Sequence, residues 1–149
     1  MSNYDSREDT LKHMQNVGKF INIIIRDLIN RKENHDKTKL SDFEKPIFDE
    51  YTPKLKNCTY GSDEYKEYLK EMGVALKHHY ENNRHHPERF ENGISDMTLV
   101  DLIEMICDWK AATLRHDDGD IIKSIEINQK RFGYSDELKN IFINTVILF

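Results

Sequence analysis

The chain has 149 residues with 22 basic and 27 acidic side chains, so its net charge near neutral pH is −5. This length predicts one folded domain, residues 1–149, large enough to bury a core without help from a metal or a disulfide. The composition, 33% charged and 38% hydrophobic, is typical of a soluble globular protein. The acidic balance argues against general nucleic-acid binding, but it is compatible with a small phosphorylated substrate.

Cysteine content and hydropathy predict a cytoplasmic protein. Cys58 and Cys107 are far apart and form no CxxC spacing, which indicates buried free thiols in a reducing compartment. The N-terminal segment MSNYDSREDT is polar and acidic, unlike a signal peptide. The longest apolar run, residues 23–25, is too short to cross a membrane, so we expect no membrane partner.

Helical periodicity dominates the first half of the chain. Residues 8–32 carry apolar side chains three and four positions apart, which predicts a core-facing helix. Residues 33–40 are polar and predict a break. The capping-box spacing of Ser41 and Glu44 predicts a short second helix, although Pro46 leaves its start open. Residues 51–62 contain Pro53 and predict a loop.

The second half of the chain predicts further helices. Ser62 caps a helix on which Met72 and His79 share a face, and Thr98 with Asp101 caps the next. A helix over residues 121–132 and a C-terminal helix follow, separated by the break at 133–136. No linker is long enough to divide domains. We therefore predict an all-α single domain of five to six helices, with residues 120–149 packing on the rest.

Histidine is the informative residue type, because familiar catalytic motifs are missing. The chain has no GxxxxGK[ST], GxGxxG, HExxH or GxSxG motif. It has seven histidines: His13, His35, His78, His79, His85, His86 and His116. Asp36 follows His35 directly, and imidazole and carboxylate are ligands that suit Zn, Fe, Mn, Co and Ni.

The positions of these residues in the predicted helices also favour a metal site. His13 and His79 lie on apolar helix faces, and Asp108 sits in a strongly apolar helix, where an unpaired buried carboxylate would be costly. A metal would remove that cost. Each residue also has a structural explanation: His13 as a hydrogen-bonded core histidine, Asp108 in an ion pair with Lys110 or Arg115. The hypothesis of a metal site is wrong only if all of these structural explanations are true at once.

The order of these residues resembles the HD-domain superfamily, whose helical metal site is built from H…HD…D. The run HDKTK at 35–39 is similar to the HDxxK often found there, and the resemblance spans about residues 10–116. The chain also looks like a small bacterial and phage branch carrying HDK[ST]KL, HHPE and EMxCDWKAA motifs. The matching residues, in chain order, are His13, His35, Asp36, His79, His85, His86 and Asp108.

The resemblance implies one or two divalent ions, with Mn, Fe, Co, Ni, Zn and Mg all open. One ion would be held by His13, His35, Asp36 and Asp108. If a second ion binds, Asp36 would bridge the two, and the second would take His79 and either His85 or His86. The spacing of His79 and His86 requires the helix to end between them, because seven residues of α-helix rise about 10.5 Å.

The resemblance further implies a phosphohydrolase acting on a nucleotide or another small phosphorylated metabolite through a metal-activated water. Lys39 and Arg115 would neutralise charge on the phosphate, and Glu104 would orient a ligand histidine. Two alternatives stay open: an HD-type di-iron oxygenase, and a non-catalytic metal- or nucleotide-binding phage accessory protein. A homodimer is also open, with residues 141–149 as core or as a dimer face.

Overall fold

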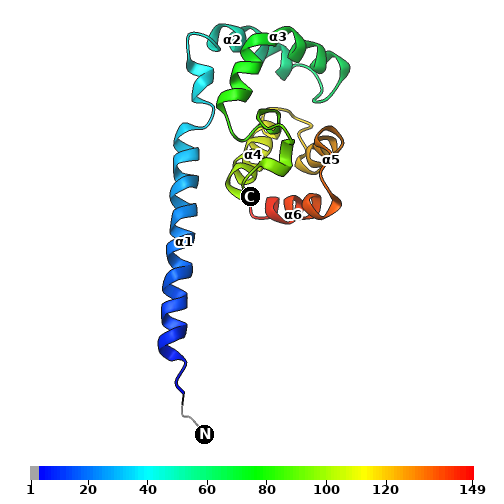
Figure 1. Cartoon of the computed structure of the whole chain (residues 1–149). Coiled ribbons are helices and arrows are strands. Elements are labelled where there is room, and N and C mark those ends of the chain that lie inside the picture. The colour runs from blue at the N-terminus through cyan, green and yellow to red at the C-terminus, as the bar shows by residue number, and fades with distance from the viewer. Residues whose placement is uncertain (1–3) are drawn as a thin grey trace. The chain divides into compact units, whose positions relative to one another are not determined.

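The computed structural model describes residues 4–149, so the first three residues of the polar N-terminal segment lie outside the described part. Helices joined by short connections make up this part, and no strand occurs within it (Figure 1). The predicted all-α fold class is confirmed. The elements are α1 (Arg7–Asn34), η1 (Lys37–Leu40), α2 (Lys45–Lys56), α3 (Asp63–Asn82), η2 (Pro87–Arg89), η3 (Gly93–Asp96), α4 (Leu99–Thr113), α5 (Ile121–Phe132) and α6 (Asp136–Val146).

The chain divides into two compact units, one ending at Asn34 and one running from His35 to Phe149. The first unit is built on α1, a helix of 28 residues. No residue of α1 is buried, and its apolar stripe, which the periodicity predicted to face a core, is exposed instead. The single domain of residues 1–149 stays a prediction.

The second unit has its main core among α4, α5 and α6. The buried side chains of this core are Met105, Ile106, Ile125, Tyr134, Phe142 and Val146. Gly133 ends α5 with a left-handed φ of 69°, which glycine adopts without steric cost. The hydroxyl of Tyr134 donates a hydrogen bond to the carbonyl of Ile125, 2.5 Å away, and so satisfies its polar atom inside the core.

Helix α2 corrects the loop predicted for residues 51–62. It extends through Pro53 to Lys56, although a proline inside a helix removes one backbone hydrogen bond. Residues Ile47, Tyr51 and Leu55, spaced one helical turn apart, are partly buried, and α2 packs against α3. Tertiary packing therefore outweighs the local preference of proline for a helix end.

Two of the three helix caps predicted from the sequence are present. Ser62 accepts a hydrogen bond from the backbone of Tyr65, and Thr98 with Asp101 forms a complete capping box. The capping box predicted for Ser41 and Glu44 is wrong. The Ser41 hydroxyl accepts from the Glu44 backbone nitrogen, but the Glu44 side chain makes no cap and is fully buried among histidines.

Two smaller predictions also have outcomes. No helix within residues 4–149 is long and apolar enough to cross a membrane. Both cysteines are free; Cys58 is buried as predicted, whereas Cys107 is exposed, contrary to the prediction.

Candidate metal centre

One unit, His35–Phe149, supplies a cluster of imidazoles and carboxylates from four separate segments. His35 and Asp36 follow α1, His79 is in the last turn of α3, and His85 with His86 lies in the turn between α3 and η2. Glu104 and Asp108 come from successive turns of α4. These segments are far apart in the sequence, so only the tertiary fold brings their side chains together.

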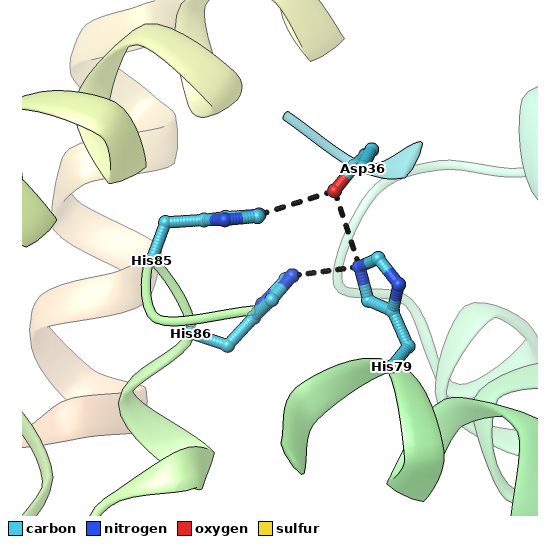
Figure 2. A group of neighbouring side chains, drawn as sticks. All are labelled: Asp36, His79, His85 and His86. Atoms are coloured by element: carbon cyan, nitrogen blue, oxygen red, sulfur yellow. Dashed lines mark hydrogen bonds and ion pairs between the residues drawn. The ribbon is translucent and has the colours of Figure 1, made fainter. Parts of the chain in front are cut away.

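The first group of ligand atoms comes from Asp36, His79, His85 and His86 (Figure 2). Oδ1 of Asp36 lies 3.2 Å from Nε2 of His79 and 3.3 Å from Nε2 of His85. Nε2 of His79 lies 3.0 Å from Nε2 of His86. Two nitrogens bound to one ion at about 2.1 Å can be at most about 4.2 Å apart, and these distances satisfy that limit.

The second group consists of His35, His85 and Asp108. Nε2 of His35 lies 3.6 Å from Oδ1 of Asp108 and 3.5 Å from Oδ2 of Asp36. Nε2 of His85 lies 3.7 Å from Oδ2 of Asp108. Since His85 belongs to both groups and Asp36 contacts both, the two groups adjoin each other.

The end of α3 explains how His79 and His86 meet. The helix ends at Asn82, and Asn83 has extended backbone angles. His86, which precedes Pro87, is also extended, as a residue before proline prefers. The helix end required by the spacing is present, and both His85 and His86 reach the cluster.

Glu104 supports the histidines of the second group from behind. Its Oε1 lies 2.9 Å from Nδ1 of His35 and 3.2 Å from Nδ1 of His85. A carboxylate at Nδ1 keeps a proton on that nitrogen, so Nε2 is the nitrogen that can bind a metal once it carries no proton of its own. Glu104, to which the resemblance assigned an orienting role, therefore contacts two of the predicted ligand histidines.

Glu44 makes the corresponding contact in the first group, and the sequence analysis missed it. Its carboxylate is fully buried and accepts hydrogen bonds from His79 Nδ1 at 3.0 Å and from Thr38 Oγ1 at 3.0 Å. It also lies 2.6 Å from Nδ1 of the half-exposed His78. The capping-box spacing with Ser41 concealed this role, because it offered a local explanation for the same glutamate.

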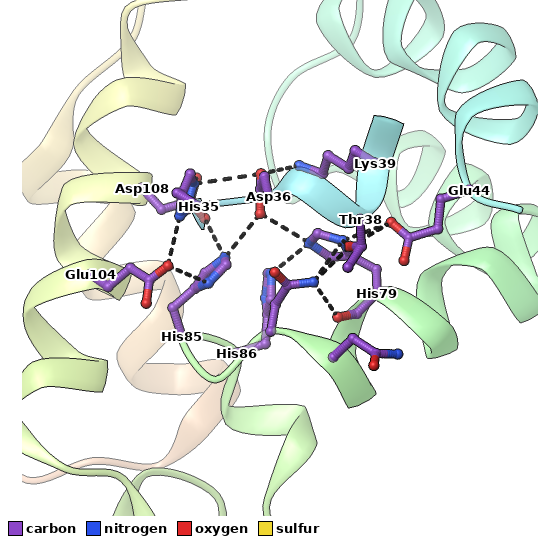
Figure 3. A network of polar contacts seen from close by, with 12 residues as sticks. His35, Asp36, Thr38, Lys39, Glu44, His79, His85, His86, Glu104 and Asp108 are labelled. Carbon is purple, nitrogen blue, oxygen red and sulfur yellow. Dashed lines mark hydrogen bonds and ion pairs between the residues drawn. The ribbon is translucent and has the colours of Figure 1, made fainter. Parts of the chain in front are cut away.

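Thr38 (Figure 3) and its neighbour Asn83 complete this polar network. The Asn83 side-chain amide donates to Thr38 Oγ1 and to the carbonyl of His79, both at 2.8 Å. No sequence pattern distinguishes these two residues from ordinary loop and helix-end residues. Their contacts fix the last turn of α3 and hence the direction of the His79 ring.

Asp36 is held in an unusual backbone conformation. Its φ is 56° and its ψ is 14°, which makes it the one residue other than glycine with a positive φ in the described chain. This left-handed conformation is disfavoured for residues with a Cβ, although Asp tolerates it better than most. Such strain typically persists where the surrounding structure requires a particular side-chain direction.

Three buried atoms of the cluster lack hydrogen bonds among residues 4–149: Asp36 Oδ1 and both ring nitrogens of His85. Asp36 Oδ1 and His85 Nε2 face each other, and neither forms a hydrogen bond within the described chain. An unsatisfied buried polar group costs about 1–3 kcal/mol. A divalent cation bound by both atoms would remove this cost, so the donor set fits a metal ion.

The protonation states reflect a strongly polar site. Contacts with Asp108 and Glu104 raise the pKa of His35 to about 10. Burial lowers the pKa of His86 to about 2, and the neighbouring His85 and His79 add to this effect. Burial opposes ionisation of Asp36, but the contacts with His79 and His85 outweigh it and hold the pKa of that carboxyl far below its usual range.

The remaining predicted residues have different surroundings. Lys39 Nζ lies 2.6 Å from Oδ2 of Asp36, at the edge of the cluster. Arg115 follows α4 and lines a cavity of about 380 Å³ together with Lys56 and His116, to which no residue of the two groups contributes. His13 is exposed on α1, in the other unit, and belongs to neither group. Its role as a ligand stays a prediction.

Comparison with known proteins gives a family. The model of the "Family of unknown function (DUF5662)" matches residues 2–147. No curated protein matches the chain, and no solved structure matches it. The chemistry of the site therefore has to be inferred from its own residues.

Proposed function

The chain belongs to the DUF5662 family, and we propose that it is a metal-dependent phosphohydrolase of the HD type. Its substrate would be a nucleotide or another small phosphorylated metabolite. The proposal includes one or two divalent ions, held by His35, Asp36, Asp108 and the histidines at 79, 85 and 86.

A single observation carries the proposal. Asp36 Oδ1 and His85 Nε2 are buried without hydrogen bonds at the point where the ligand atoms converge. Structural ion pairs and hydrogen-bonded networks normally satisfy buried polar atoms. Here the buried atoms without hydrogen bonds lie among imidazoles whose Nδ1 atoms face Glu44 and Glu104. This arrangement is typical of a metal site.

The ion, the two glutamates and Lys39 would each contribute differently to hydrolysis. A bound divalent ion lowers the pKa of a coordinated water and polarises a phosphoryl oxygen. Glu44 hydrogen-bonds Nδ1 of His79, and Glu104 hydrogen-bonds Nδ1 of His35 and lies near Nδ1 of His85, so that the Nε2 atoms of the three rings are directed into the site. Lys39, beside Asp36, supplies a positive charge where charge on a phosphate would develop.

Metal content and phosphate release test the proposal together. The full chain is loaded with Mn, Co, Ni or Mg and assayed against panels of nucleotides, phosphomonoesters and phosphodiesters. We expect stoichiometric metal by elemental analysis and metal-dependent hydrolysis of at least one substrate. Asp36→Ala should lose both, and Asp49→Ala, which removes an exposed carboxylate of α2, should lose neither.

Several outcomes would contradict the proposal. Stoichiometric metal in both Asp36→Ala and His35→Ala would show that the ion binds elsewhere. Metal without any hydrolysis would favour the non-catalytic binding protein.

A di-iron oxygenase is the second candidate. The observation that favours it is the adjacency of the two groups, which share His85 and both contact Asp36, since two neighbouring sites with mixed imidazole and carboxylate ligands suit iron. Two irons per chain and oxygen consumption with an organic substrate would support this candidate against the phosphohydrolase.

A further inference from the structure

Arg84 and Asp101 form an ion pair beside the metal centre, and the proposed function does not use it. Nε of Arg84 lies 3.0 Å from Oδ1 of Asp101, and Nη2 of Arg84 lies 2.9 Å from Oδ2. The Asp101 side chain is fully buried, so its charge needs partners, and the two parallel hydrogen bonds of the guanidinium supply them. The pair joins the first turn of α4 to the ligand turn, residues 83–90, which carries His85 and His86.

Helix capping explains only part of this arrangement. The backbone nitrogen of Thr98 donates to Oδ2 of Asp101 at 2.9 Å, which completes the capping box of α4. An asparagine at position 101 would also accept this hydrogen bond. Only a carboxylate accepts two guanidinium donors in parallel. Asp101 therefore makes one contact for its own helix and two for the ligand turn.

His85, which follows Arg84 directly, depends on its backbone for its position. Its side chain is 1% exposed, and neither of its ring nitrogens has a hydrogen bond in the part of the chain that the structure describes. Its ring packs against the rings of His35 and His86, with centroids 4.5 Å and 4.1 Å away. Because no hydrogen bond holds the ring, the anchoring of the preceding residue determines where the His85 side chain begins.

One stripe of α4 contacts two successive residues of the ligand turn. Asp101, Glu104 and Asp108 lie within about 60° of one another around the helix. Asp101 binds Arg84, whereas Glu104 Oε1 and Asp108 Oδ2 lie 3.2 Å and 3.7 Å from the ring nitrogens of His85. A shift of the turn along α4 would break the first contact and move His85 away from Asp108. The ion pair thus sets the register of the turn on α4.

Arg84 also holds the far end of the ligand turn. Its Cζ lies 5.1 Å from the ring centroid of Phe90, a distance at which a guanidinium is attracted to an aromatic face. One side chain therefore contacts both α4 and the end of its own turn. A lysine would not replace it, because the ammonium has no planar fork that binds a carboxylate through two parallel bonds.

We propose that Arg84 and Asp101 are positioning residues of the metal centre, whose ion pair holds His85 in register with Glu104 and Asp108. The proposal rests on the metal site proposed above. Neither residue belongs to the two groups of ligand atoms, so both act through the backbone of the ligand turn.

Titration of the full chain with Zn²⁺ tests the proposal. Arg84→Met should weaken Zn²⁺ affinity at least roughly tenfold, the lower end of the loss typical for a residue that supports a metal-binding histidine. Arg84→Lys keeps the charge without the two parallel bonds and should give a smaller loss; it also serves if Arg84→Met does not fold. Thr98→Ala is the matched control, because it removes the other capping hydrogen bond, to the Asp101 backbone nitrogen at 3.2 Å, and leaves the ion pair. It should lower the melting temperature and leave the affinity unchanged.

The ring of His85 gives a second readout that needs no metal. Its proton chemical shifts depend on the neighbouring rings of His35 and His86, so nuclear magnetic resonance of the metal-free chain reports its position. Arg84→Met should move these signals, and Thr98→Ala should leave them in place. An ion pair that only stabilised the fold would lower the melting temperature without moving them.

A double variant tests whether the two residues act as one pair. Asp101→Asn should weaken Zn²⁺ affinity as much as Arg84→Met, and the two changes together should cost no more than either alone. Additive losses, unchanged His85 signals in both Arg84 variants, or an equal loss of affinity in Thr98→Ala would overturn the proposal. If the unaltered chain binds no divalent ion, the proposed function is wrong, whereas the His85 signals of the metal-free chain still decide the positioning role.

Discussion

The cluster has two sides: the first group, with His79 and His86, and the second group, with His35 and Asp108. The two sides are built alike but differ in charge (Figure 3). On one side, buried Glu44 supports His79, and the pKa of His86 falls to about 2. On the other side, Glu104 and Asp108 surround His35 and raise its pKa to about 10. One side therefore contains an imidazole that is already neutral, whereas the other contains one that is protonated without a metal.

An ion would therefore bind the two sides by different reactions. An ion beside His86 meets a free lone pair on that ring. An ion beside His35 must first displace a proton, but it then gains the carboxylates of Asp108 and Asp36. Since a metal ligand must be deprotonated, pH should affect the two sides unequally.

Asp36→Ala should have the largest effect, because Asp36 contacts histidines of both groups. We expect loss of stoichiometric metal and of any metal-dependent phosphate release, with helix content nearly unchanged. Elemental analysis and circular dichroism measure the two quantities. If one group retained full metal occupancy in this variant, the two groups would be independent sites that do not depend on Asp36.

Glu104→Gln should come next and should exceed Glu44→Gln. Loss of a carboxylate behind a metal-binding histidine typically weakens metal affinity about 10- to 100-fold. Glu104 contacts the rings of both His35 and His85, whereas Glu44 supports one histidine of the groups, His79. Titration calorimetry of both variants compares the effects, and a larger loss in Glu44→Gln would reverse the proposed ranking.

The pH dependence of metal affinity should differ between the two sides, because only one of them must release a proton when the ion binds. In His79→Ala, which leaves the His35 side, metal affinity should rise about tenfold per pH unit between pH 6.5 and 8.5, because His35 stays protonated up to its pKa of about 10. In His35→Ala, which leaves the His86 side, the slope should be smaller, since the pKa of His86 is about 2. Equal slopes in the two variants would contradict the assignment.

His78→Gln should have the smallest effect on metal binding. His78 contacts the same buried carboxylate as His79, with Nδ1 2.6 Å from Glu44, but it is half-exposed and belongs to neither group. We expect its metal affinity to stay close to that of the unaltered chain. A loss as large as that of Glu44→Gln would mean that Glu44 depends on both histidines for its orientation.

Much of the fold followed from local patterns. Ser62 and Thr98 begin helices as their spacing predicted, because capping depends on residues within one turn. Pro53 did not follow its local preference, because packing of α2 against α3 outweighs it. The stripe of α1 was correctly assigned to a helix, but periodicity gives the apolar face and not what covers it.

The candidate site shows the same limit. The order of histidines and aspartates pointed to residues 13, 35, 36, 79, 85, 86 and 108; the last six lie in the two groups, whereas His13 belongs to neither. Glu44 was assigned to a cap, and the choice between His85 and His86 stayed open, because both questions concern partners far apart in the chain. Glu44 meets His79 across 35 positions.

The helices and the kinds of ligand atoms could be read from the chain alone, since both depend on neighbouring residues and on side-chain chemistry. Packing between distant segments sets which carboxylate contacts which ring, ends α3 early enough for His86 to reach His79, and gives Asp36 its left-handed backbone conformation. These features depend on side chains that converge from distant segments, and no local pattern encodes such convergence.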